Sequence, residues 1–210
     1  MAAVFFDVDG TLVRWSSDYA AILRDAFERA GVDDPDEAWL ASYDERFFEH
    51  FGAFAEDPYH RAFADVCEDH PVDAEPGELA EALVAAEFAA VEPVPGVAET
   101  VERLAANHTL GILTNGIPDV QFGKVEEIGL LDRFDARVAS HDPEIEATKP
   151  DRDIYEAAKS RVDAETYVMV GDDREPDVEG ARERGFRTVH VDADATGLSA
   201  PDFRTLATLL

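Results

Sequence analysis

The sequence lacks the residues that would build disulfides, cysteine-rich metal sites or membrane spans. Cys67 is the only cysteine among 210 residues, which excludes an intrachain disulfide and a cysteine-rich zinc site and fits a reducing compartment. No stretch approaches about 18 uninterrupted apolar residues, and the first residues lack the basic flank and apolar run of a signal peptide. We therefore expect a cytoplasmic protein that binds no membrane.

Basic residues are also scarce, and lysine above all. The chain carries 18 lysines and arginines against 47 aspartates and glutamates, for a net charge of -29, and only three of the basic residues are lysines. A field of this sign repels nucleic acid and anionic surfaces, so we expect no nucleic-acid partner. The acid-rich, lysine-poor composition resembles the halophilic type of protein surface, adapted to high internal salt. Because salt screens the self-repulsion of the chain, we predict that stability depends on salt.

With 46% hydrophobic residues the chain can bury a core, and many of its apolar residues fall in short runs. Each run ends in a polar, turn-prone cluster and precedes a helical pattern, as strands of a buried parallel sheet do. The runs cover residues 3–6, 110–113, 136–139, 167–170 and 187–191, and the helical patterns begin near Gly96, Pro118, Asp151 and Pro176. This alternation predicts an α/β fold with a doubly wound parallel sheet.

A long insertion separates the first two predicted strands, because far more residues lie between them than one connection requires. The pattern there is helical, with helices expected at 17–30, 36–51, 58–69 and 77–91. We predict a core domain of residues 1–15 and 92–210 and an α-helical cap domain of residues 16–91. An insertion at this point would lie over the C-terminal edge of the sheet, where open α/β folds bind ligands, and would be placed to act as a lid.

The segment VFFDVDGTL, residues 4–12, places two carboxylates directly after the first buried strand. Asp7 and Asp9 are two residues apart and therefore project to the same side. Phosphoryl transfer needs an oxygen nucleophile and a proton donor for the leaving oxygen, and these carboxylates can supply both. Gly10 allows a turn of unusual backbone geometry, and Thr11 can offer its hydroxyl or amide to a phosphate. The alternative is a turn that merely caps a helix.

The FDVDGTL string resembles the first motif of the haloacid dehalogenase-like (HAD) hydrolase superfamily, and three further segments resemble the later motifs in the expected order. LGILTNG contains Thr114 and Asn115, which the resemblance assigns to phosphate binding. Lys149, followed by Pro150, matches the lysine that neutralises the nucleophile and the phosphoryl group. The stretch HDPEIEATKP lacks the glycine often seen before that lysine, which leaves the local loop shape open. The resemblance implies a Rossmann-like core with a helical cap between the first and second motifs.

The fourth segment, VMVGDDREPDVEGA, carries three aspartates. The resemblance implies a Mg²⁺ ion held by Asp7, the backbone carbonyl of Asp9, and Asp172. Asp177 would ligate through water or orient the motif lysine, and Asp173 is a further candidate for such an indirect role. The alternative for Asp173 and Asp177 is an acidic loop near a helix N-terminus, where the helix macrodipole favours negative charge.

The acidic residue at position 9 bears on the reaction. Dehalogenases of this superfamily need no metal, and their first motif has a nonacidic residue two positions after the nucleophile. By this resemblance, Asp9 favours phosphoryl transfer. The predicted activity is that of a Mg²⁺-dependent phosphatase acting on a small-molecule phosphomonoester. Asp7 attacks phosphorus, and Asp9 acts as general acid and then as general base in hydrolysis of the aspartyl phosphate. A phosphosugar mutase, and a noncatalytic Mg²⁺ or phosphate-binding regulatory module, are the alternatives.

The cap would choose the substrate, and there the sequence says less. Arg14, Arg46 and Arg61 are candidates for contact with an anionic or polar leaving group, with the alternative that they pair with carboxylates in so acidic a chain. A row of aromatic residues at helical spacing is more typical of the core of the cap than of a ring-stacking site, and comprises Tyr43, Phe47, Phe51 and Phe54. The sequence leaves open the particular phosphomonoester and the oligomeric state.

Overall fold

The computed structural model describes residues 1–191. The chain divides into two compact units: one comprises Met1–Arg14 together with the chain from Val91 onward, and the other comprises Trp15–Ala90. Strands β2 (Val13–Trp15) and β3 (Val91–Pro93), at the two junctions, form a two-stranded sheet. The junctions lie one residue from the domain boundaries predicted at 15/16 and 91/92. The roles of the two units as catalytic core and lid stay a prediction.

The first unit is built on a parallel sheet with five strands among the described residues, in the order β5–β4–β1–β6–β7. The strands are β1 (Ala2–Phe6), β4 (Thr109–Thr114), β5 (Ala136–Ala139), β6 (Thr166–Gly171) and β7 (Arg187–His190). The central strand β1 is buried throughout. Its last residue, Phe6, pairs with Ile112 on one side and with Val170 on the other. The loops that follow β1, β4 and β6 therefore share one edge of the sheet.

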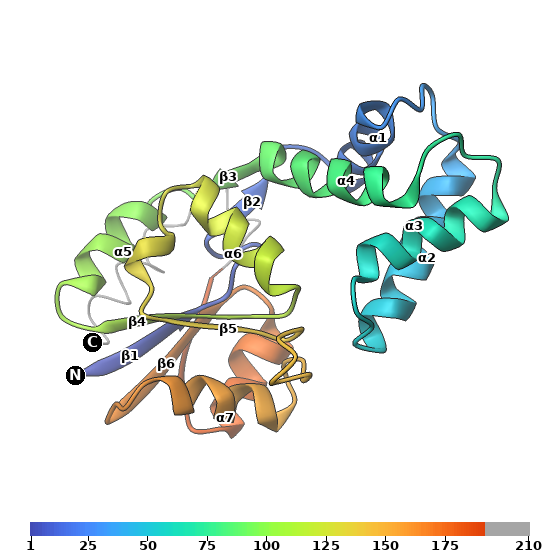
Figure 1. The fold of residues 1–210 in the computed structure, drawn as a ribbon. Coiled ribbons are helices and arrows are strands. Elements are labelled where there is room, and N and C mark those ends of the chain that lie inside the picture. The colour runs from blue at the N-terminus through green and yellow to red at the C-terminus, as the bar shows by residue number, and fades with distance from the viewer. Residues whose placement is uncertain (192–210) are drawn as a thin grey trace. The chain divides into compact units, whose positions relative to one another are not determined.

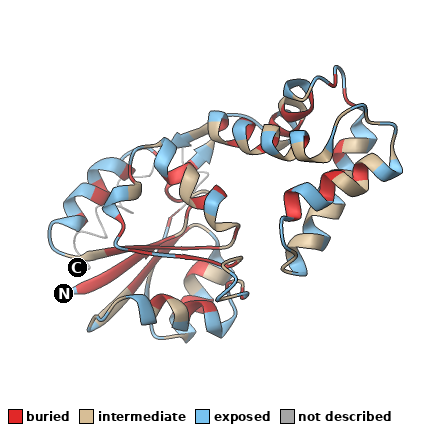
Figure 2. Cartoon of the chain, in the orientation of Figure 1, coloured by how far each residue is buried: buried red, intermediate tan, exposed pale blue. Residues whose placement is uncertain are grey.

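Two apolar layers cover the sheet, because successive strand residues point to opposite faces. Val4 and Phe6 belong to a cluster with residues of α5 (Val97–Ala105) and α6 (Pro118–Glu127), whereas Ala3 and Phe5 belong to a cluster with residues of α7 (Arg152–Arg161). Figure 1 shows α5 and α6 on one face of the sheet and α7 on the other, and Figure 2 shows the buried strands between them. The predicted doubly wound α/β fold is confirmed.

The last helical segment differs from the expected one. A π-helical stretch spans Arg174–Gly180 and passes into the short helix α8 (Ala181–Glu183), where the sequence predicted a regular helix starting near Pro176. The Pro176 carbonyl accepts a hydrogen bond from the Tyr155 hydroxyl on α7. Gly185 follows with φ 83° and ends the segment. A short 3₁₀ turn, η1 (Leu131–Arg133), precedes β5.

The second unit consists of helices. They are α1 (Tyr19–Arg29), α2 (Glu37–Gly52), α3 (Pro58–Asp69) and α4 (Pro76–Ala90), and every end lies within two residues of its predicted place. Gly31, with φ 85°, follows α1 as expected of a helix terminator. Within the part of the chain that the structure describes, none of the helices is long and apolar enough to cross a membrane.

Each of these four helices contributes one residue to a largely buried polar cluster. The hydroxyls of Tyr19 on α1 and Tyr59 on α3 donate to the same carboxylate oxygen, Oε1 of Glu87 on α4, at 2.9 and 3.0 Å. Tyr43 on α2 is fully buried, and its pKa is raised well above the ordinary value by burial and by the neighbouring Tyr19 and Glu87. We call these four residues the tyrosine–glutamate cluster.

The aromatic row of α2 packs inside the same unit. The Phe47 ring centroid lies 5.9 Å from that of Tyr43, 5.1 Å from that of Tyr59 and 5.4 Å from that of Phe51. The row therefore packs within the helical unit, with Tyr43 buried and Phe47 and Phe51 partly exposed. Phe54 departs from the row, because it lies beyond the end of α2 with φ 50°.

Candidate active site

The loop after β1 is shaped by backbone hydrogen bonds and by one glycine. The Asp7 amide donates to the carbonyl of Val170 at 2.9 Å and continues the pairing of β1 with β6. Gly10 has φ 76°, and a Cβ atom at this position would lie 2.2 Å from Oδ2 of Asp172. Only glycine therefore satisfies both the backbone angle and the close approach. The Thr11 hydroxyl donates to Oδ1 of Asp172 at 3.1 Å, so it holds a carboxylate of the fourth motif.

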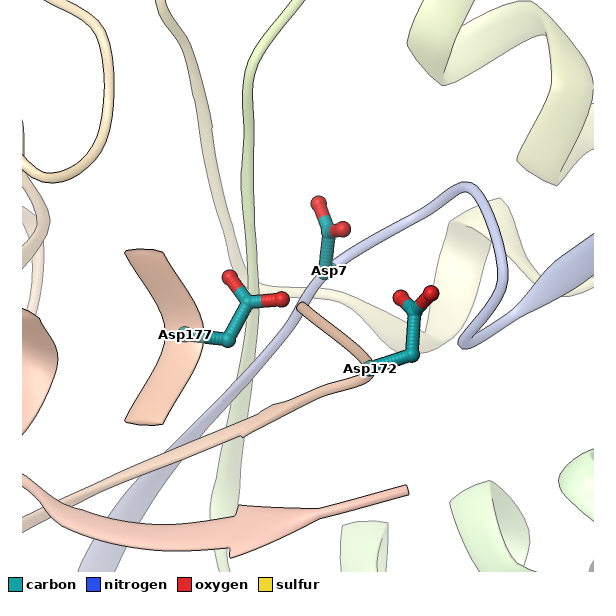
Figure 3. Close-up of side chains that lie close together, drawn as sticks. All are labelled: Asp7, Asp172 and Asp177. Carbon is teal, nitrogen blue, oxygen red and sulfur yellow. The ribbon is translucent and has the colours of Figure 1, made fainter. Parts of the chain in front are cut away.

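Three carboxylates converge at the shared edge of the sheet. One oxygen from each of Asp7, Asp172 and Asp177 lies within 4.8 Å of the others, and Figure 3 shows the three side chains together. Asp7 follows β1 and Asp172 follows β6, while Asp177 comes from the π-helical segment. Gly171 makes room for Asp177, because a Cβ atom there would lie 2.1 Å from Oδ2 of Asp177. The structure thus brings together residues about 165 positions apart in sequence, as expected where parallel strands end at one edge.

A buried lysine pairs with two of these carboxylates. Nζ of Lys149 is 2.6 Å from Oδ1 of Asp177 and 3.0 Å from Oδ1 of Asp7. Burial alone would lower the pKa of Lys149, but the charges of Asp7 and Asp177 outweigh it and hold the pKa above its ordinary value. Lys149 is therefore an ammonium ion with two carboxylate partners.

The three carboxylates together carry more negative charge than one ammonium can balance. Burial, and then the charge of Asp7, raise the pKa of Asp172 from 3.8 to about 6, although the hydrogen bond from Thr11 opposes the shift. Burial also raises the pKa of Asp177, against the opposing charge of Lys149. A cation that approached these oxygens would relieve the repulsion, and hard oxygen donors suit Mg²⁺.

The second-motif residues lie at the end of β4 and after it. Thr114 is buried at the strand end. The Asn115 side chain holds the backbone of Lys149 from both sides: its Nδ2 donates to the Lys149 carbonyl at 3.0 Å, and its Oδ1 accepts from the Lys149 amide at 2.7 Å. The Asn115 side chain therefore positions the lysine loop, and phosphate binding by Thr114 and Asn115 stays a prediction. The Gly116 amide donates to Oγ of Ser140 at 2.9 Å.

Asp173 and the three arginines contact groups of the protein itself. The Asp173 carboxylate accepts from the Glu175 amide at 3.2 Å and so caps the π-helical segment. Arg14 pairs with Glu92 at 3.0 Å. The remaining two belong to the helical unit, where Arg46 pairs with Glu49 and Asp69 at 3.4 and 3.0 Å and Nε of Arg61 donates to the carbonyl of Glu56 at 2.7 Å. Their role in specificity stays a prediction.

Two residues of α6 belong to the site although the sequence did not single them out for it. Nε2 of Gln121 donates to Oδ2 of Asp9 at 2.8 Å, and Nζ of Lys124 donates to Oδ1 of Asp9 at 3.1 Å. Both side chains are buried. A signal was present, because Lys124 is one of three lysines and lies three residues after Gln121, on the same face of a helix that buries Val125.

This fold and this arrangement of motifs define a hydrolase of one superfamily. The family model described as haloacid dehalogenase-like hydrolase matches residues 1–185, so the chain belongs to that family. It is a hydrolase whose relatives include phosphatases that act on nucleotides and sugar phosphates.

Particular relatives span different shares of the chain. Ribulose-1,5-bisphosphate 5-phosphatase of Halopiger xanaduensis is 32% identical over 92% of this chain and 87% of its own length. Pyrimidine 5'-nucleotidase YjjG of Escherichia coli is 33% identical over 58% of this chain, and the match spans only 55% of YjjG. Among solved structures, the HAD-hydrolase YfnB from Bacillus subtilis, bound to magnesium, superposes with a TM-score of 0.74 at 19% identity, covering 100% of this chain and 98% of YfnB. At that identity the likeness shows the fold.

Proposed function

We propose that this chain is a Mg²⁺-dependent phosphatase that hydrolyses a small-molecule phosphomonoester through an aspartyl phosphate on Asp7. The observation that carries the proposal is the convergence of Asp7, Asp172 and Asp177, of which Asp7 and Asp177 pair with the ammonium of Lys149. Asp9 follows Asp7 by two residues, on the same loop. Nucleophile, acid–base group, fixed cation and a set of metal-binding oxygens are then available at one edge of the sheet.

The donor set fits Mg²⁺. This ion prefers oxygen ligands and retains several waters, so a few protein oxygens suffice. Asp7, Asp172 and the backbone carbonyl of Asp9 would hold it. Asp177 would act through water or through Lys149, because its Oδ1 accepts from the Lys149 ammonium and its Oδ2 from a backbone amide at 3.2 Å. When bound, Mg²⁺ would supply positive charge that offsets the charge on the phosphoryl oxygens.

The proposed reaction has two balanced steps. In the first, a carboxylate oxygen of Asp7 forms a bond to phosphorus while the bond from phosphorus to the ester oxygen breaks, and Asp9 gives its proton to that oxygen. In the second, Asp9 takes a proton from water, the water oxygen attacks the same phosphorus, and Asp7 is released with inorganic phosphate. Lys149 remains an ammonium throughout and offsets negative charge at the nucleophile.

The relatives suggest which substrates to try first. The Halopiger protein, named for ribulose 1,5-bisphosphate, matches most of this chain, whereas the nucleotidase matches little more than half of it. We therefore rank phosphorylated sugars ahead of pyrimidine nucleotides.

The test is phosphate release from a panel that includes ribulose 1,5-bisphosphate, UMP and p-nitrophenyl phosphate, with Mg²⁺ and with EDTA, at low and high KCl. We expect release with Mg²⁺ that EDTA abolishes. Isomerised sugar phosphate with little free phosphate would identify a phosphosugar mutase instead. Mg²⁺ binding without turnover of any ester would identify a noncatalytic binding module.

A further inference from the structure

Two side chains of α6 donate hydrogen bonds to the carboxylate of Asp9. Nζ of Lys124 lies 3.1 Å from Oδ1 and 3.3 Å from Oδ2, and Nε2 of Gln121 lies 2.8 Å from Oδ2. The Lys124 side chain is 5% exposed, whereas the Asp9 side chain is 38% exposed. Both oxygens of a partly exposed carboxylate are therefore fixed by buried donors, while part of the same carboxylate remains accessible.

Burying the polar side chains of Lys124 and Gln121 costs folding free energy. That cost argues that their contacts with Asp9 have a function. A buried lysine requires a partner to offset its desolvation. Gln121 also keeps a buried oxygen: within residues 1–191, Oε1 has no hydrogen-bond partner, at a cost of roughly 1–3 kcal/mol. Rotating the amide by half a turn would not remove that cost, because its oxygen would then face the Asp9 carboxylate and the Asn115 carbonyl, both of which need a donor.

Gln121 also contacts the second-motif residues at the end of β4 and in the loop after it. Nε2 of Gln121 is also 3.0 Å from the Asn115 carbonyl and 3.4 Å from Oγ1 of Thr114. A Cβ atom on Gly116 would lie 2.5 Å from Cγ of Gln121, so the glycine lets this side chain fold back over the end of β4. Gln121 therefore joins the loop after β4 to the acid–base residue of the loop after β1.

We propose that Lys124 and Gln121 are positioning residues that hold the Asp9 carboxylate where it exchanges a proton with the leaving oxygen. This inference rests on the proposed phosphatase function. A general acid must lie within hydrogen-bond reach of the atom that it protonates, and a displacement of about 1 Å at a reacting group can cost roughly 100-fold in rate. Lys124 and Gln121 act through Asp9 and do not touch the phosphoryl group in this scheme.

The experiment compares two leaving groups. An alkyl phosphate releases an alkoxide that must be protonated, whereas p-nitrophenyl phosphate releases a phenolate that needs little protonation, and kcat/KM reports on this first cleavage. We expect Lys124→Met to lower kcat/KM roughly 100-fold for an alkyl phosphate and less than about 10-fold for p-nitrophenyl phosphate. The affinity for Mg²⁺ should stay within about twofold, since neither residue belongs to the proposed donor set.

Lys159→Met is the matched control, because it removes the same charge from another helix of the same unit. Nζ of Lys159 lies 5.4 Å from the centre of the Phe186 ring and bonds to the Arg184 carbonyl, apart from the described site. It should leave the ratio of the two kcat/KM values unchanged. Lys124→Arg, which keeps the charge, should recover part of the loss.

The outcomes separate the two claims. An active wild type whose Lys124→Met variant loses equal activity on both substrates, or none, would overturn the positioning role alone. If Lys124→Met does not fold, Gln121→Met takes its place and must show the same preference for the better leaving group, or the inference fails. A wild type that hydrolyses no ester in the presence of Mg²⁺ would overturn the proposed function and this inference with it.

Discussion

One ammonium and three carboxylates make up the centre of the site, and their charges determine how single substitutions act. Lys149 contacts Asp7 and Asp177, while Asp172 lies across from them and accepts from Thr11. A neutral replacement at Asp7 or Asp172 removes a repulsive charge as well as an oxygen of the proposed site. Activity and stability are therefore expected to change in opposite directions.

The substitution Asp7→Asn tests the proposed role of Asp7 as nucleophile. We expect kcat to fall by a factor of roughly 10⁴ while the fold remains intact, because an amide oxygen is a poor nucleophile and the side-chain volume is unchanged. Steady-state phosphate release and far-ultraviolet circular dichroism measure the two effects. Asp132→Asn is the control, since Asp132 is exposed in the η1 turn and should retain full activity. Substantial turnover by Asp7→Asn would remove Asp7 from the nucleophile role.

The raised pKa of Asp172 predicts a pH-dependent stability in the absence of metal. Because its folded-state pKa of about 6 exceeds the ordinary 3.8, the folded form binds the proton more tightly. The stabilising contribution is complete at pH values below 3.8 and is lost as the pH rises through about 6. We expect Asp172→Asn to raise the thermal midpoint in EDTA, by more at about pH 7 than at about pH 5.

Magnesium supplies the second half of that test. Mg²⁺ should raise the thermal midpoint of the wild type at neutral pH and have a much smaller effect on Asp172→Asn, since a ligand that binds only the folded state stabilises it. A midpoint for Asp172→Asn below that of the wild type in EDTA at both pH values would contradict the proposed repulsion.

The sequence predicted the site residues whose place follows from the strand pattern. It did not predict contacts between segments far apart in the chain. Asp7 and Asp172 directly follow β1 and β6, and Asp9 lies in the loop after β1, so the strand pattern alone placed all three at one edge of the sheet. The contact of Asn115 with the Lys149 backbone spans 34 positions, and that of Lys124 with Asp9 spans 115. Such contacts depend on how helices pack against the sheet, and periodicity does not encode that packing.

At the scale of elements, glycine and proline lie at several helix ends. Gly31 and Gly185 adopt positive φ after their helices, and Pro58 begins α3 as predicted. The π-helical turn at Arg174–Gly180 was not predicted, because a wider turn requires no particular residue and leaves the apolar spacing nearly unchanged. The tyrosine–glutamate cluster was likewise not predicted from the sequence, because each of its members comes from a different helix.

That cluster makes a prediction for the helical unit. Glu87→Leu leaves the hydroxyls of Tyr19 and Tyr59 without their shared acceptor, and Tyr59 is buried. We expect the free energy of unfolding to fall by about 2 kcal/mol or more, because an unpaired buried polar group costs roughly 1–3 kcal/mol. Urea denaturation followed by tyrosine and tryptophan fluorescence measures this.

The control for that change is Glu81→Leu on the same helix, where the side chain is exposed. It should shift the free energy of unfolding by no more than about 0.5 kcal/mol. Equal losses for the two variants would show that the buried acceptor contributes nothing of its own.

At the scale of the whole molecule, charge dominates. The net charge of -29 on 210 residues means that the acidic side chains repel one another. The described ion pairs are largely exposed, such as Arg133 with Glu102, and exposed ion pairs contribute little to stability. We expect the thermal midpoint to rise between about 0.05 and 1 M KCl, as the screening length falls to roughly 3 Å. The rise should flatten at higher salt, where screening is nearly complete. A midpoint that is the same at both concentrations would contradict the prediction.

The helical unit begins and ends at neighbouring points of the backbone. The Ser16 amide donates to the Ala90 carbonyl at 2.8 Å, and β2 and β3 pair beside this point. When the first and last residues of an inserted segment are neighbours, the segment can be shortened, exchanged or replaced by a short loop. The flanking strands then keep their positions. We therefore expect that evolution or protein engineering can replace residues 15–90 by a shorter segment without changing the order of the strands in the parallel sheet.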